Sequence, residues 1–84
     1  MITILYFASI REHMGKAKDT VELTENITTV EALIRHLSET DSAFSQLHQS
    51  TNPPLISVNH TFAEASSPIA SGDEVGIFPL MTGG

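Results

Sequence analysis

The last two residues, Gly83 and Gly84, are the part of the chain whose type and position could do chemistry. Glycine has no Cβ and adopts almost any backbone conformation, so a Gly-Gly end can enter a channel too narrow for side chains. An apolar segment, residues 79–82, leads directly into the pair, whereas chain ends that only fray are usually polar. We therefore expect Met81, Thr82 and Gly83 to form an extended tail whose working group is the carboxylate of Gly84.

Other reactive groups are scarce in this sequence. It has no cysteine, so it offers no disulfide, thiolate metal site or nucleophilic thiol. None of the four histidines forms a metal-ligand pattern such as HExxH, and we expect no metal site. The serines lack a nucleophile-elbow motif, and the glycines form no phosphate-binding or dinucleotide-binding loop. The chain by itself is not expected to be a catalyst or to bind a cofactor.

Composition narrows the class of partner. Eighty-four residues make one small domain, with a net charge of −6 that argues against nucleic acid and suits a basic protein surface. No apolar run reaches the length of a membrane span, and no signal peptide is recognisable at the start. We expect a cytoplasmic protein with a folded domain over residues 1–80 and a tail over residues 81–84.

Hydrophobic periodicity indicates the elements that hold the tail. Alternation predicts strands over residues 2–7, 18–24, 55–58, 61–63 and 75–80. A short helical turn over residues 8–14 should end at Gly15. The main helix should begin with a capping box of Thr28 and Glu31 and carry an apolar stripe, and a weaker helix is expected over residues 43–48.

This order of elements, β-β-α-β-β, predicts an α+β fold of the β-grasp type. One main helix can cover only one face of a mixed sheet of four to five strands. The strand residues expected to meet that helix are Ile4, Tyr6, Val21, Leu23, Ile56, Val58, Val75 and Ile77.

The opposite face of the predicted sheet carries exposed apolar side chains. It should show Leu5, Phe7, Phe78 and Leu80, with Phe62 nearby. An exposed apolar patch usually marks a protein interface. The alternative is that the loop over residues 59–71 folds across it. Because the patch adjoins the start of the tail, we favour the interface.

The residues at both ends of the chain resemble a known family. Tyr6-Phe7-Ala8 and the following Arg11-Glu12, together with the segments over residues 72–75, 78–79 and 82–84, resemble the small subunit of molybdopterin synthase, a ubiquitin-like sulfur carrier. The likeness extends over nearly the whole length. The terminal Gly-Gly alone would be a weak sign, because several ubiquitin-like proteins share it.

The resemblance implies a cycle of loading and unloading. An adenylating enzyme of the ubiquitin-activating type would use ATP to activate the carboxylate of Gly84, and a sulfur donor would convert it to a thiocarboxylate. The tail would then enter the large synthase subunit of a heterotetrameric complex. There the sulfur would pass to a cyclic pyranopterin precursor and build the dithiolene of molybdopterin.

The same resemblance assigns roles to individual positions. Gly84 would bear the sulfur, and Gly83, which has no side chain, would leave room for it in a narrow channel. The positions that would face the large subunit or direct the tail are Phe7, Arg11, Phe62, Phe78, Pro79 and Leu80. Gly76 and the Leu80-Met81 step depart from the family pattern and leave the fine specificity for the partner open.

Three other readings stay open at the level of sequence. A thiamin-type carrier would keep the sulfur chemistry and change the pathway, although Arg11-Glu12 and Phe78-Pro79 look unlike that branch. A ubiquitin-like modifier would join Gly84 to lysine side chains of other proteins. An interaction domain with an inert tail would need no chemistry at Gly84.

Overall fold

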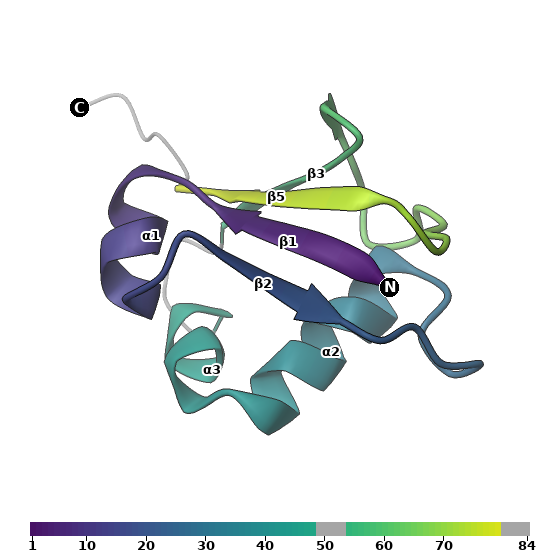
Figure 1. Ribbon diagram of the computed structural model, residues 1–84, viewed down its shortest axis with the longest axis horizontal. Coiled ribbons are helices and arrows are strands. Elements are labelled where there is room, and N and C mark those ends of the chain that lie inside the picture. The colour runs from purple at the N-terminus through teal and green to yellow at the C-terminus, as the bar shows by residue number, and fades with distance from the viewer. Residues whose placement is uncertain (49–53, 80–84) are drawn as a thin grey trace.

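A computed structural model describes residues 1–48 and 54–79, which form five strands and three helices (Figure 1). In chain order the elements are β1 (Ile2–Tyr6), α1 (Ala8–Met14), β2 (Lys18–Val21), α2 (Val30–Thr40), α3 (Ser42–His48), β3 (Leu55–Val58), β4 (Thr61–Phe62) and β5 (Glu74–Phe78). No helix in the described part of the chain is long and apolar enough to cross a membrane.

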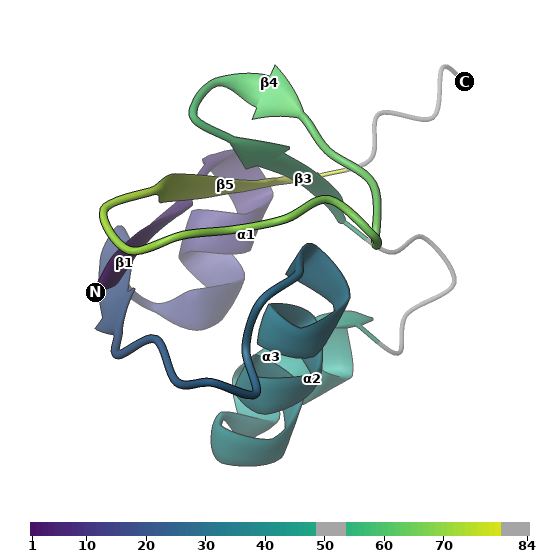
Figure 2. The ribbon, with the colours of Figure 1, turned by 90° about the vertical axis from the view of Figure 1, so that its right-hand side faces the viewer.

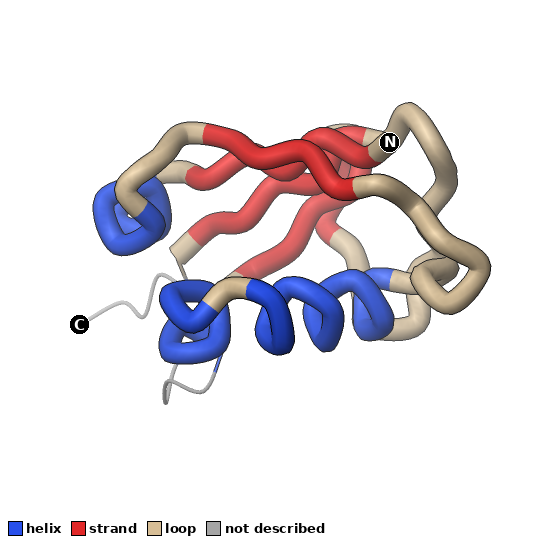
Figure 3. Tube along the Cα trace, turned by 60° about the horizontal axis from the view of Figure 1, so that its bottom comes forward, coloured by secondary structure: helices blue, strands red, loops and turns tan. Residues whose placement is uncertain are grey.

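The strands form one mixed sheet in the order β2-β1-β5-β3-β4. The central strands β1 and β5 are parallel, and the other three pairs are antiparallel. Figure 3 shows α2 and α3 lying along one face of this sheet, with α1 at one end. Parallel central strands with the main helix across one face define a β-grasp, so the predicted α+β fold is confirmed.

The core lies between that face and the helices. The apolar stripe of α2 buries Val30, Leu33 and Leu37 against the inward side chains of β1 and β5. Phe44 of α3 is fully buried, although only a weak helix was predicted for its segment. The inward residues named from the sequence all belong to this core: Ile4, Tyr6, Ile56, Val75 and Ile77 are buried, and Val21, Leu23 and Val58 are partly buried against them.

The start of α2 differs from the predicted one by one residue. Thr29 is the N-cap, and its Oγ1 accepts a hydrogen bond of 3.2 Å from the Ala32 N–H. The expected capping box of Thr28 and Glu31 was therefore wrong. The carbonyl of Thr28 instead accepts a hydrogen bond of 3.0 Å from the Ile69 N–H, which ties that residue to a loop.

The ends of the other elements shift for local reasons. α1 ends at Gly15 as predicted, with a left-handed φ of 73° and an N–H that donates to the Arg11 carbonyl. β1 stops at Tyr6 because Phe7 is the N-cap of α1. β2 ends at Val21, short of the predicted residue 24.

A tight hairpin joins β3 to β4 and fixes the start of β5. Its two turn residues, Asn59 and His60, both have positive φ, as a type I′ turn requires. The Asn59 amide donates to Asp73 Oδ1 and accepts from the Glu74 N–H, each at 3.0 Å. The turn is thereby attached to the strand that carries the tail.

The loop after β4 packs on the helix side of the sheet. Its carbonyls at Ala65 and Ser67 accept hydrogen bonds from the N–H groups of Glu31 and Val30 at the start of α2. Figure 2 shows the loop running toward α2 and then back to β5. The loop therefore leaves the opposite face of the sheet uncovered, and the alternative that it hides the aromatic side chains is wrong.

Candidate docking surface at the start of the tail

Three phenylalanines gather on the face of the sheet that carries no helix. The rings of Phe7 and Phe78 are stacked, with centroids 4.4 Å apart and planes within 4°. Phe62 meets Phe78 edge-on, with a centroid distance of 5.8 Å and an angle of 66°. Offset-stacked and edge-to-face pairs are both favourable aromatic geometries. We call Phe7, Phe62 and Phe78 the aromatic cluster.

Strand alternation explains why these rings face outward. Tyr6 and Ile77 point into the core, so their neighbours Phe7 and Phe78 point to the other side. The hydrogen bond from the Phe7 N–H to the Ile77 carbonyl, 3.1 Å long, brings the two strand ends together. Phe62 comes from β4, on the far side of β3.

The cluster is exposed enough to bind a partner. Phe7 is 37% exposed and Phe62 is 69% exposed, which leaves large apolar surfaces facing solvent. Leu55 is also 37% exposed. It pairs with Phe78 across β3 and β5, so it lies on the same face of the sheet and adds a third apolar surface. The sequence indicated a strand at residues 55–58, but Leu55 was not expected in the interface. A contiguous patch of this kind is characteristic of an interaction surface.

The tail begins at this patch. β5 ends at Phe78, and half-buried Pro79 is the last residue that the structure describes. The predicted positions Leu80, Met81, Thr82, Gly83 and Gly84 lie outside the described residues. The described chain therefore ends next to the stacked rings.

Arg11 lies in α1, the helix that follows Phe7. Its N–H lies 3.4 Å from the Phe7 carbonyl, so it stands one helical turn after Phe7 and is exposed. Between them, Ala8 has a φ of 50°, which is uncommon for a residue with a side chain. The sharp turn at Ala8 starts α1 directly after the strand end that carries Phe7.

A polar network on the opposite side of the sheet braces the domain. The Tyr6 hydroxyl donates to Asp19 Oδ2 at 3.1 Å, and Lys16 Nζ lies 2.7 Å from the same carboxylate. Burial, together with the Asp19 charge, raises the pKa of Tyr6 above its ordinary value. Lys16 also lies 3.5 Å from Asp41, between α2 and α3, so the network joins the helices to the sheet edge. It lies apart from the aromatic cluster, and its role is structural.

Two of the described histidines make contacts within the fold. Nε2 of His13 contacts the Ala43 carbonyl at 2.7 Å, which ties α1 to α3. His60 lies 3.4 Å from Glu74, at the end of β5 opposite the tail. Among the described residues, no group of three or more His, Cys, Asp or Glu side chains could hold a metal ion.

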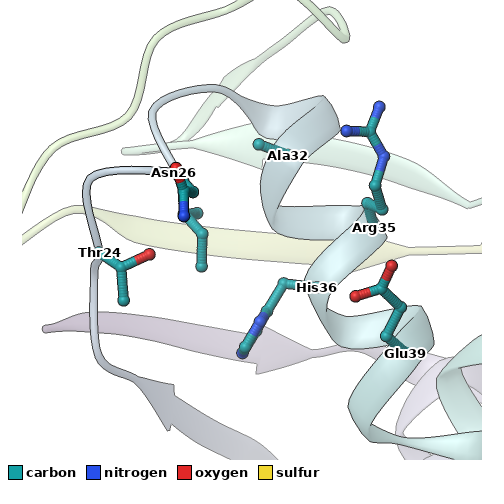
Figure 4. Close-up of a pocket in the computed structure, with 7 residues that line it drawn as sticks. Thr24, Asn26, Ala32, Arg35, His36 and Glu39 are labelled. Atoms are coloured by element: carbon teal, nitrogen blue, oxygen red, sulfur yellow. The ribbon is translucent and has the colours of Figure 1, made fainter.

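A shallow pocket on the outer side of α2 also lacks reactive geometry. It lies between the loop before α2 and the helix, and Figure 4 shows the His36 ring directed away from the Glu39 carboxylate. The pocket is also formed by elements far from the start of the tail.

The chain is similar in sequence to known proteins. The chain matches the ThiS family over residues 4–84. It is 37% identical over 84 residues to the "Molybdopterin synthase sulfur carrier subunit" of Escherichia coli, and 32% identical over 84 residues to the protein of the same name from Haemophilus influenzae. Both alignments cover 100% of each chain.

Solved structures show the same fold. SAMP1 from Haloferax volcanii superposes with a TM-score of 0.79 at 23% identity, covering 99% of this chain and 98% of that one. A chain from the complex of subunits 1 and 2 of the molybdopterin-converting factor of Helicobacter pylori superposes with a TM-score of 0.68 at 13% identity, covering 99% and 97%.

Proposed function

We propose a mechanism for this chain from one premise: it belongs to the ThiS family, in which it groups with the molybdopterin synthase sulfur carrier subunits. In this mechanism the carboxylate of Gly84 is the site of chemistry. A carboxylate oxygen attacks the α-phosphorus of ATP on an adenylating enzyme, and pyrophosphate leaves. A donor of sulfur at the oxidation level of sulfide then attacks the acyl carbon, AMP leaves, and a thiocarboxylate remains on Gly84.

The loaded tail then delivers its sulfur inside a partner. We propose that the partner is the large subunit of molybdopterin synthase and that the acceptor is a cyclic pyranopterin precursor. Four extended residues span roughly 13–14 Å, enough for the tail to reach a buried site while the domain stays outside. Two glycines at the tip keep the tail narrow.

The aromatic cluster at the start of the tail is the observation that carries this proposal. A domain that presents its own terminus to other enzymes needs a binding surface next to that terminus. Phe7, Phe62 and Phe78 form an exposed apolar patch at the end of β5, from which the tail departs. Aromatic residues are enriched at the energetic centres of protein interfaces. Docking through this patch would aim the tail into the partner.

The remaining described surface supports a carrier that relies on its partners for catalysis. The His60–Glu74 contact lies at the wrong end of β5 to act on Gly84. The adenylating enzyme and the large subunit would therefore supply the acids, bases and metal ions of each step. The chain would contribute the carboxylate and the docking surface.

Mass spectrometry of the intact protein tests the loading step. The chain is incubated with ATP, its adenylating enzyme and a sulfur donor, and the same mixture without ATP is the control. We expect the ATP-dependent appearance of a species in which one oxygen has been replaced by sulfur. If neither an acyl-adenylate nor this species forms, the proposal is wrong.

A second measurement separates the carrier from a protein modifier. Cell extract is probed by immunoblotting for covalent adducts of this chain. A carrier runs at its own mass, because its acyl group passes to no lysine. A ladder of larger products that disappears when Gly84 is deleted would favour the modifier.

A further inference from the structure

Gly76 occupies the centre of the exposed sheet face, directly beneath the stacked rings. It lies in β5, two residues before Phe78 and therefore on the same face. A Cβ built at Gly76 would stand 2.8 Å from Phe78 Cε1 and 3.2 Å from Phe7 Cε2. Both rings thus lie in space that any other residue at this position would need.

The backbone does not require glycine at this position. Gly15 and Gly72 have positive φ values, which favour glycine, but Gly76 is not among the positive-φ residues of the described chain. Glycine within a strand is destabilising relative to alanine, and it commonly marks a close approach of another group. The distances identify that group as the pair of phenylalanine rings.

A second small residue completes the floor under the rings. Ser57 pairs with Gly76 across β3 and β5, and its Oγ would lie 2.6 Å from a Cβ at Gly76. Although Ser57 is polar and belongs to the face without helices, it is only 6% exposed. Phe62, its partner in β4, and the stacked rings close over it.

We propose that Gly76 is a positioning residue that determines the shape of the docking surface and so the choice of large subunit. Without a Cβ at this position, Phe7 and Phe78 lie flat against β5 and form a flat apolar surface, and the Phe62 ring stands edge-on beside it. The partner that fits is a protein surface with a flat apolar area. This inference rests on the proposed function, because the large subunit is the partner it concerns.

The flat surface formed by Phe7 and Phe78 depends on Gly76, whereas the fold of the domain depends on it much less. A methyl group at residue 76 must push the Phe78 ring outward and rotate the Ser57 hydroxyl, and both groups lie outside the core cluster. The ring pair would then lose its flat arrangement while the core between the sheet and α2 stays intact. Docking and folding should therefore respond differently to the same substitution.

The test is Gly76→Ala, measured for docking, folding and ring position. We expect the Kd for the large subunit to rise about tenfold or more, as for loss of part of an interface hot spot. The unfolding midpoint should stay within about 4 °C of wild type. In NMR spectra of the wild type, the Gly76 α-protons should show contacts to the Phe78 ring. In Gly76→Ala the corresponding contacts should weaken, because the ring is displaced outward.

Two further variants separate positioning from general destabilisation. Gly15→Ala introduces strain at a positive φ with open space around it, so it should lower the unfolding midpoint and leave docking unchanged. In a Phe78→Leu background, Gly76→Ala should weaken docking much less, because the displaced ring is absent. Equal effects of Gly76→Ala in both backgrounds would overturn the proposal.

The remaining outcomes are also decisive. Wild-type docking with unchanged ring contacts in Gly76→Ala would show that the glycine has no such role. If Gly76→Ala does not fold, the double variant Ser57→Gly/Gly76→Ala replaces it, because loss of the Ser57 side chain opens space on the β3 side. This double variant should fold and still dock weakly. If it docks as tightly as the wild type, the inference is refuted. If the unmodified protein fails to bind the large subunit, the proposed function fails, and the NMR contacts alone then decide whether Gly76 positions the rings.

Discussion

Replacement of Phe78 by alanine should separate binding from folding. Its ring stacks on Phe7 and meets Phe62 edge-on, so the substitution removes both ring contacts of the aromatic cluster at once. Phe78 is partly exposed and does not belong to the buried core. The substitution should therefore remove the centre of the docking surface without leaving a cavity in the core.

The two effects can be estimated from these contacts. Each aromatic pair contributes about 0.5–1.5 kcal/mol, so losing two should lower the free energy of unfolding by roughly 1–3 kcal/mol. Phe44 is fully buried, and Phe44→Ala should lower the free energy of unfolding by about 3–5 kcal/mol, as for core phenylalanines. A residue at the centre of an interface contributes about 2 kcal/mol or more to binding, equivalent to a rise in Kd of roughly 30-fold.

Urea unfolding and isothermal titration calorimetry can measure the two quantities on the same samples. Urea unfolding gives the free energy of unfolding for the wild type, Phe78→Ala and Phe44→Ala, and isothermal titration with the large subunit gives the Kd. We expect Phe78→Ala to stay folded and to bind weakly. If it unfolds as readily as Phe44→Ala, or binds as tightly as the wild type, the assignment of this ring to the docking surface is wrong.

Three other predictions follow from the tail, the helix cap and the charged turn. One alanine appended after Gly84 should abolish acyl-adenylate formation while the unfolding midpoint stays unchanged; normal loading of the extended chain would contradict the carrier mechanism. Thr29→Ala should lower the free energy of unfolding by about 1 kcal/mol through loss of the N-cap, whereas exposed Thr28→Ala should change it little in the same urea titration. Hydrogen bonds from the Asn59 amide and from a backbone N–H hold the pKa of Asp73 below its ordinary value of 3.8. This contribution to stability is present above that value and is lost as the pH falls through the lowered pKa, so unfolding curves across this acid range should show a smaller loss for Asp73→Asn than for the wild type.

Local patterns in the sequence were sufficient to predict most of the fold. The apolar stripe of α2 and the alternation in β1 and β5 each follow from the spacing of neighbouring residues, and both are confirmed. The cap of α2 was misplaced because Thr28 and Thr29 are chemically alike. The hydrogen bond from the distant Ile69 N–H to the Thr28 carbonyl is a tertiary contact that the local sequence does not reveal.

The docking surface was predictable in part. Alternation placed Phe7 and Phe78 on the outer face, which the structure confirms. The contributions of Leu55 and Gly76 depend on register: Leu55 lies opposite Phe78, and Gly76 lies opposite Ser57. Register between strands that are 20 residues or so apart in the chain is a tertiary property, so the sequence pattern of one strand could not show it.

The pairing of β1 with β5 has a consequence for biosynthesis. These central strands come from opposite ends of the chain, and the Gly72 N–H donates to the Met1 carbonyl at 2.8 Å. Until β5 leaves the ribosome, β1–β2 and β3–β4 are separate two-stranded pairs, and an isolated two-stranded pair is marginally stable in water. Residues 74–78 must therefore be synthesised before the domain can fold, and a product that stops before residue 74 lacks the strand that joins the two strand pairs. Prematurely terminated chains should neither fold nor compete with the finished protein for its partners.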